Sequence, residues 1–127
     1  MKSARQRDTA PEKDLRSALH RLGLRYRIHC KPIREIQRRA DILFRSARVA
    51  VYVHGCFWHG CPKHATWPKA NAEFWRTKIE TNRKRDADTS RRLAKAGWLA
   101  VRVWEHEDPF IAATRIAVIV RQRRESL

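Results

Sequence analysis

The chain has 127 residues, the size of one domain with a single hydrophobic core. It carries 29 Lys and Arg against 13 Asp and Glu, a formal net charge of +16, which favours a polyanionic partner such as DNA or RNA. No apolar run approaches the roughly 20 residues that cross a bilayer, and no signal-peptide pattern is visible, so we expect a cytoplasmic protein. In that reducing compartment the three cysteines are more simply metal ligands or free thiols than disulfides.

The first predicted helix has recognisable start and stop signals. Thr9, with Glu12 three residues later, matches a capping box, and Pro11 suits the first helical turn. Apolar residues then recur at helical spacing until Gly23, which is typical of the residue just past a helix end.

Three predicted strands follow this helix. Residues 24–29 alternate apolar and polar side chains, as in a half-buried strand, and residues 33–39 are predicted to form a loop. Residues 40–44 predict a second strand. Residues 48–54 predict a third, and because it is apolar on both faces we expect it inside the sheet.

The C-terminal half predicts two helices around a fourth strand. The first spans residues 71–97, with Asn71 as its cap, and residues 98–105 form the strand. Asp108 is the predicted N-cap of the last helix, residues 109–124. The order αβββαβα predicts a mixed α/β sheet flanked by helices.

The loop after the third strand carries side chains of the kind that bind zinc, at a C-x4-C-x2-H spacing: Cys56, Cys61 and His64. Structural zinc is usually held by four thiolate or imidazole ligands, so a fourth must come from another segment. His106, just past the fourth strand, is favoured, and His29 and Cys30 are rivals. The alternative without metal is a small buried cysteine and an exposed histidine.

Carboxylates and histidines near the same strands suggest phosphodiester chemistry. Asp41 lies at the start of an apolar strand, where burying a carboxylate is costly unless it meets a metal or a cation. His54 and His59 flank the turn after the third strand, and histidine can act as a general base near neutral pH. Together they predict a Mg²⁺-dependent nuclease site. Taken singly, each histidine is more simply explained by a structural role than by a catalytic one, and Glu12 is more simply explained as a helix cap.

Four segments resemble one known family. "RDTAPEKDLRSALHRLGLRYR", "HGCFWHGCPKH", "NAEFWRTKIETNRKRD" and "GWLAVRVWEHE" are similar, in this order, to the Vsr family of very-short-patch-repair DNA mismatch endonucleases. The resemblance runs from about Arg7 to Asp108. It implies one Vsr-like endonuclease domain over residues 1–127, with the fold of PD-(D/E)XK (restriction-endonuclease-like) nucleases.

The resemblance also implies an activity. Members of the family nick double-stranded DNA 5′ to the thymine of a T:G mismatch, which arises by deamination of 5-methylcytosine. They use Mg²⁺ for catalysis and work as monomers. We therefore expect a nucleoid-associated enzyme whose product passes to downstream repair proteins.

Roles at the reacting phosphate carry over residue by residue. The resemblance implies that Asp41 binds Mg²⁺ with the backbone carbonyl of Val53. It implies that His59 activates the attacking water, and that His54 and Glu12 orient the hydrated metal or the scissile phosphate. Glu12 thereby becomes a site residue instead of a simple cap.

The resemblance also assigns structural and DNA-binding residues. It implies a structural Zn²⁺ held by Cys56, Cys61, His64 and His106. It implies that three aromatic side chains wedge into the duplex beside the mismatch, namely Phe57, Trp58 and Trp75. Such wedges unstack a base step most easily where pairing is already poor. The basic charge itself predicts phosphate contacts by Arg83, Lys84 and Arg85.

Two other functions remain open. A nicking nuclease of the same fold could serve homing, phage defence or nonspecific nicking, and would cut perfectly paired DNA as readily as T:G DNA. A zinc-stabilised DNA-binding module would bind without cutting. Asp41, His54, His59 and Glu12 argue against the second alternative, because a pure binder has no need of a carboxylate at that strand.

Overall fold

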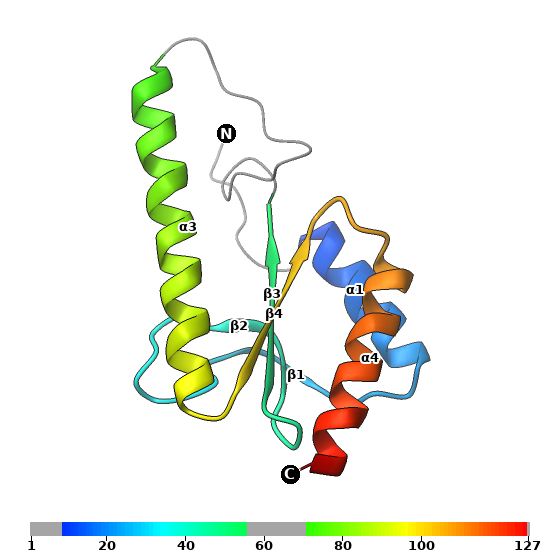
Figure 1. Cartoon of the computed structure of the whole chain (residues 1–127). Coiled ribbons are helices and arrows are strands. Elements are labelled where there is room, and N and C mark those ends of the chain that lie inside the picture. The colour runs from blue at the N-terminus through cyan, green and yellow to red at the C-terminus, as the bar shows by residue number, and fades with distance from the viewer. Residues whose placement is uncertain (1–8, 56–70, 127) are drawn as a thin grey trace.

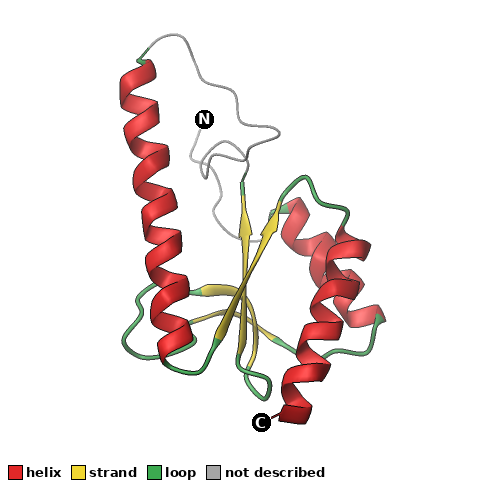
Figure 2. Ribbon diagram, in the orientation of Figure 1, coloured by secondary structure: helices red, strands yellow, loops and turns green. Residues whose placement is uncertain are grey.

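A computed structural model describes residues 9–55 and 71–126 of the chain. Four strands form one sheet with helices on both of its faces (Figures 1 and 2). The elements are α1 (Ala10–Arg21), β1 (Arg27–Cys30), β2 (Ala40–Phe44), β3 (Val49–His54), α3 (Ala72–Lys95), β4 (Leu99–Trp104) and α4 (Pro109–Ser126). The predicted mixed α/β architecture with a flanked four-stranded sheet is confirmed. Within the described ranges, no helix is long and apolar enough to cross a membrane.

The sheet has the order β1-β2-β3-β4. The pairs β1–β2 and β2–β3 are antiparallel, whereas β3 and β4 are parallel and are joined through α3. Strand β3 therefore lies inside the sheet, and five of its six residues are buried, as its apolar sequence predicted. The parallel register pairs His54 with Trp104, so the carboxyl ends of β3 and β4 lie side by side at the same end of the sheet.

Two hydrophobic clusters hold the helices on the sheet. Alternate residues of β3 serve different clusters, because successive side chains of a strand point to opposite faces. Val49 and Val51 pack in the cluster with residues of α1 and α4, whereas Ala50 and Tyr52 pack in the cluster with Leu93 of α3. Helices α1 and α4 thus cover one face and α3 covers the other (Figure 1).

Both predicted glycine stops are confirmed. Gly23 has a φ of 82°, its N–H bonds the carbonyl of His20, and the N–H of Leu24 bonds the carbonyl of Leu19. This pair of bonds is the Schellman arrangement, which needs a left-handed residue after the helix. Gly97 ends α3 in the same way, with a φ of 86°.

The predicted N-caps have mixed outcomes. Asp108 is confirmed, since its Oδ1 accepts the N–H groups of Phe110 at 2.8 Å and Ile111 at 3.1 Å. The capping box at Thr9 is wrong: the Thr9 side chain makes no cap hydrogen bond, and Glu12 is instead buried against the sheet. Asn71 precedes α3 in a left-handed conformation and also makes no side-chain cap bond.

The first strand begins three residues later than predicted, at Arg27. Residues 24–26 are held against α1 instead of pairing in the sheet. Leu24 completes the helix end, and the Tyr26 hydroxyl donates to the carbonyl of Arg16 at 3.1 Å. The alternation of the sequence over this segment reflects contact with a helix on one side, which has the same signature as a half-buried strand.

Candidate active site

A carboxylate links the two inner strands where they diverge. The backbone N–H of Val53 on β3 donates to Oδ2 of Asp41 on β2 at 2.6 Å. The last regular pair between β2 and β3 is Ile42 with Val51. The N–H of Val53 lies beyond this pair and is bonded by the Asp41 carboxylate instead of by the backbone of β2. In an extended strand the N–H and C=O of one residue face the same neighbour, so the carbonyl of Val53 also faces the β2 side.

Asp41 is one of three potential metal ligands that lie together. One ligand atom each of Glu12, His29 and Asp41 lies within 4.8 Å of the other two. The three residues come from α1, β1 and β2, and Glu12 is only 3% exposed. Packing of α1 on the sheet therefore brings Glu12 next to His29 of β1 and Asp41 of β2.

The environment of Asp41 favours a bound cation. Burial raises the pKa of Asp41 from 3.8 to about 6, which the hydrogen bond from Val53 partly offsets and the nearby Glu12 carboxylate increases. Arg38 and His29 act in the opposite direction. Two carboxylates in a partly desolvated site repel each other, and a divalent cation between them removes that repulsion.

His54 belongs to a polar network with α3. The ring is 3% exposed; its Nε2 lies 3.4 Å from Nη2 of Arg38, and its Nδ1 lies 3.6 Å from Oδ2 of Asp86. Arg38 in turn forms an ion pair with Asp86. The His54 ring also packs edge-on against Trp104, with centroids 5.6 Å apart. His54 thus lies next to Val53 in β3 and contacts Asp86 of α3 and Arg38 of the loop before β2.

Arg38 connects this network to the carboxylate site. Its guanidinium lies 4.8 Å from the ring centroid of Tyr52, and its charge lowers the pKa of Asp41. Burial raises the pKa of Tyr52 to about 12, so its hydroxyl stays protonated. Sequence reasoning missed Arg38 and Asp86 as neighbours of His54, because only the packing of α3 and of the loop before β2 brings them there.

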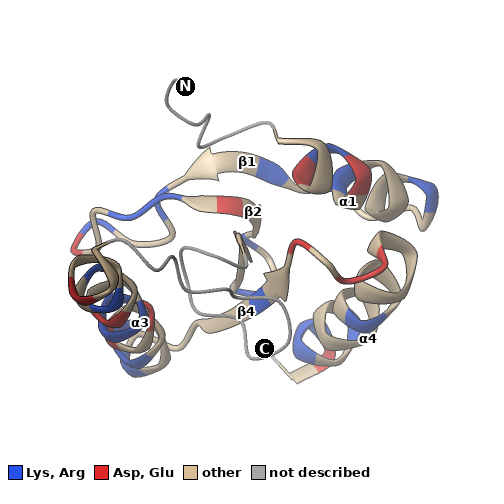
Figure 3. Ribbon diagram, turned by 90° about the horizontal axis from the view of Figure 1, so that it is seen from above, with Lys and Arg blue, Asp and Glu red and all other residues tan. Residues whose placement is uncertain are grey.

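Helix α3 carries all four of the predicted DNA-binding residues that the structure describes. Trp75 is half-buried and contacts Phe74 edge-on at 5.1 Å, and Phe74 is 56% exposed. Arg83, Lys84 and Arg85 are all exposed. Figure 3 shows Lys and Arg distributed along this helix and over α1 and α4.

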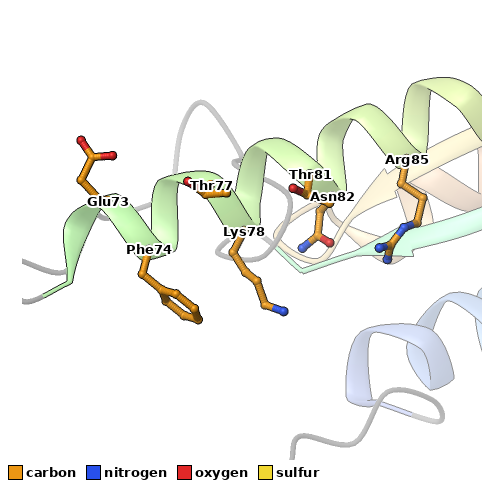
Figure 4. A pocket seen from close by; sticks show the side chains of 7 residues that line it. All are labelled: Glu73, Phe74, Thr77, Lys78, Thr81, Asn82 and Arg85. Carbon is orange, nitrogen blue, oxygen red and sulfur yellow. The ribbon is translucent and has the colours of Figure 1, made fainter.

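A groove along α3 distinguishes Arg85 from the other two basic residues. Arg85 lines it, on the same side of the helix as Lys78 and Phe74, whereas Arg83 and Lys84 do not (Figure 4). The groove is lined by Glu73, Phe74, Thr77, Lys78, Thr81, Asn82 and Arg85. Its lining combines two cations, an amide, two hydroxyls and one aromatic ring, all groups that can contact a nucleic-acid backbone or base, with one carboxylate, that of Glu73.

Several predicted residues lie outside the described ranges, namely Cys56, Phe57, Trp58, His59, Cys61 and His64. The fourth predicted zinc ligand, His106, is described: it is exposed and lies two residues beyond the end of β4. Of its rivals, His29 lies beside Glu12 and Asp41, and Cys30 is a free thiol whose Sγ lies 3.3 Å from the Ile28 carbonyl oxygen.

The sheet and its carboxylate–imidazole group define an α/β protein with a site suited to a divalent cation. A family model described as DNA mismatch endonuclease Vsr matches residues 1–65. Together with the relatives described next, this match establishes that the chain belongs to the Vsr family.

Named relatives are similar over most of the chain. The type II nicking enzyme V.NaeI of Lentzea aerocolonigenes is 42% identical over 110 residues, which cover 85% of this chain and 66% of that protein. V.XorIIP of Xanthomonas oryzae, also named a type II nicking enzyme, is 42% identical over 84% of this chain and 77% of its own length. The DNA mismatch endonuclease Vsr of Escherichia coli is 36% identical over 83% of this chain and 66% of its own length.

Proposed function

We propose that this protein is a metal-dependent DNA endonuclease that nicks one strand 5′ to the thymine of a T:G mismatch. Membership of the Vsr family supports hydrolysis of DNA. The observation that carries the proposal is the Asp41 carboxylate, which is half-buried next to Glu12 and accepts a hydrogen bond from the N–H of Val53 near the end of β3. A DNA-binding module without catalysis would have no use for this costly arrangement.

The described residues fit Mg²⁺. Oxygen ligands are what this ion prefers, and the carboxylates of Asp41 and Glu12, with the backbone carbonyl of Val53, supply them on neighbouring elements. When bound, Mg²⁺ stabilises the negative charge that develops on the phosphate and makes nearby water more acidic. The roles of the chain are then to hold the phosphate in line and to accept a proton.

We assign the protein's own groups accordingly. His59 is the proposed base that takes the proton of the attacking water. It lies five residues after His54, the last residue of β3. His54, held by Arg38 and Asp86, is proposed to orient the scissile phosphate. The contacts of the buried His54 ring with Arg38 at 3.4 Å and with Asp86 at 3.6 Å would favour one ring orientation, as positioning requires.

DNA binding is proposed to use the basic surface and aromatic wedges. The net charge of +16 favours the phosphate backbone, and the exposed arginines and lysine of α3, Arg83, Lys84 and Arg85, would supply contacts. Phe57, Trp58 and Trp75 are the proposed wedges at the mismatch. A structural Zn²⁺ held by Cys56, Cys61, His64 and His106 is proposed to fix the loop that carries two of these wedges.

We further propose that residues 1–127 act as one domain with restriction-endonuclease-like architecture, and as a monomer. The names of V.NaeI and V.XorIIP, type II nicking enzymes, favour nicking as such and leave the mismatch to be tested. Nicking of paired DNA in another task is therefore the second candidate.

The deciding experiment compares two strand-labelled duplexes that differ only in a T:G or a C:G pair, each with and without Mg²⁺. A nick confined to the thymine strand of the mismatched duplex supports the proposal. Equal cutting of both duplexes supports the second candidate. Binding of both duplexes without cutting, unchanged in Asp41→Asn, contradicts an enzymatic function.

A further inference from the structure

We infer that His29 is a third protein ligand of the divalent cation held by Asp41 and Glu12, so that the site has one nitrogen and at least two carboxylate ligands. This inference rests on the proposed function, because it concerns the same cation. It goes beyond the sequence expectation, which considered His29 only as a rival ligand for the structural zinc.

The spacing of the three side chains fits one ion. Their ligand atoms lie within 4.8 Å of one another. Ligands on opposite sides of an octahedral ion with bonds of about 2.1 Å are roughly 4.2 Å apart, and adjacent ligands roughly 3 Å. An adjacent pair at the 4.8 Å limit would have to close by about 1.8 Å, so side-chain movements of up to about 1 Å for each ligand atom bring the group onto a cation.

The sheet register explains why His29 meets Asp41. Ile28 pairs with Ile42 and Cys30 pairs with Ala40, so His29 and Asp41 both lie between these two pairs, where the left-handed His29 interrupts the regular ladder. The register thus brings the two residues to the same level of the sheet, and their ligand atoms lie within 4.8 Å of each other. Glu12 then approaches this pair from α1, which gives a ligand set drawn from three separate elements.

The backbone fixes His29 in an uncommon conformation. Its φ is 53°, in the left-handed region, which is unfavourable for a non-glycine residue. The paired residues on either side and the hydrogen bond from Nη1 of Arg39 to the His29 carbonyl, 3.1 Å long, hold it there. A side chain held in this way is preorganised toward the carboxylates, which is the property that a metal ligand needs.

An imidazole ligand changes which metals the site prefers. Mg²⁺ gains little from nitrogen ligands, whereas Mn²⁺ and the later first-row ions bind nitrogen more strongly. A site made only of Asp41, Glu12 and a backbone carbonyl would discriminate weakly between Mg²⁺ and Mn²⁺. With His29 as a ligand, the site should favour Mn²⁺, and the preference should depend on the imidazole.

The test measures metal binding directly on the full chain, loaded with Zn²⁺ and then dialysed against a weak chelator, so that Zn²⁺ remains at thiolate sites and not at the carboxylate–imidazole group. Free Mn²⁺ is followed by its electron paramagnetic resonance signal, and Mg²⁺ affinity is obtained by competition. We expect His29→Ala to weaken Mn²⁺ binding about tenfold and Mg²⁺ binding far less, because the lost ligand is nitrogen. His20→Ala, in the exposed last turn of α1, should bind both ions as the unaltered protein does.

A second variant separates the ligand from the backbone. His29→Asn tolerates the left-handed conformation but lacks the imidazole, so it should keep the melting temperature and still lose the Mn²⁺ preference. Mn²⁺ affinity within twofold of the unaltered protein in both folded variants, or no Mn²⁺ binding by the unaltered protein, would overturn the inference.

The same titration separates this inference from the proposed function. If Asp41→Asn abolishes Mn²⁺ binding while the His29 variants do not alter it, the cation site stands and only the role of His29 is wrong. If Asp41→Asn binds Mn²⁺ as the unaltered protein does, the cation site of the proposed function is wrong as well, and with it the inference.

Discussion

The N–H of Val53 bonds Oδ2 of Asp41 at 2.6 Å, so the central strand of the sheet directly holds the carboxylate of its neighbour. A carboxylate has two oxygens and several acceptor positions, so Asp41 can keep this bond and still bind a cation. The carboxylate is thereby oriented by a strand with five of its six residues buried, and precise orientation is what phosphoryl chemistry demands.

Replacing the carboxylate should separate cutting from binding. Asp41→Asn keeps an oxygen that can accept the Val53 N–H but removes the charge that attracts a cation. We expect nicking of the T:G duplex to fall by about 10³-fold or more, with DNA affinity changed less than threefold. Gel-based nicking and fluorescence anisotropy measure the two quantities. Asp88→Asn, at an exposed site on α3, should leave both unchanged.

The raised pKa of Asp41 predicts a pH dependence of stability without Mg²⁺. Between pH 3.8 and about 6 the folded state binds more protons at Asp41 than the unfolded state does, so this residue makes folding less favourable as pH rises through that window. Above it the cost is fully present and amounts to as much as roughly 3 kcal/mol.

Asp41→Asn should therefore be more stable than the unaltered protein near pH 7, and the advantage should shrink toward zero near pH 4. Urea unfolding across this range in Mg²⁺-free buffer measures the difference. A constant difference at every pH would show that the carboxylate is not destabilised by burial. Adding Mg²⁺ near pH 7 should reduce the difference, because the bound ion stabilises only the ionised carboxylate.

The ion pair between Arg38 and Asp86 should matter for both stability and positioning. The Asp86 side chain is 11% exposed, so Asp86→Asn leaves the Arg38 charge partly buried without its partner. We expect a loss of about 1 to 3 kcal/mol in unfolding free energy. The exposed pair of Asp88 with Arg91 provides the control, since Asp88→Asn should cost no more than about 0.5 kcal/mol.

The same variant tests whether the network positions His54. If it does, Asp86→Asn should lower kcat for nicking while leaving KM for DNA nearly unchanged, and it should shift the pH profile of kcat. A purely structural role predicts that nicking recovers fully at a temperature where the variant is folded.

The groove on α3 predicts unequal roles for neighbouring arginines. Arg85 lines the groove together with Lys78, whereas Arg83 does not. If a phosphate lies there, Arg85→Ala should reduce the slope of log affinity against log salt by about 0.9, and Arg83→Ala should change it much less. Anisotropy titrations between roughly 50 and 200 mM salt give the slope. Equal changes for both variants would mean that only overall charge matters.

Local patterns determined much of this protein before its fold was known. Gly23 and Gly97 predicted where two helices end, because the residue after a helix often takes a left-handed conformation. Asp108 predicted where the last helix begins, because its side chain can cap the free N–H groups of the first turn. The segment of β3 is apolar on both faces, and this local pattern predicted a strand inside the sheet. Asp41 stood out because a carboxylate in an apolar strand needs a compensating partner.

Only the tertiary structure decided which partners those residues have. Glu12 matched a capping box but is buried beside Asp41, since the packing of α1 outweighs one surface hydrogen bond. His29 meets Asp41 through strand register, and Asp86 meets His54 through the packing of α3. Register and helix packing depend on how the whole core fills space, and no short stretch of sequence contains that information.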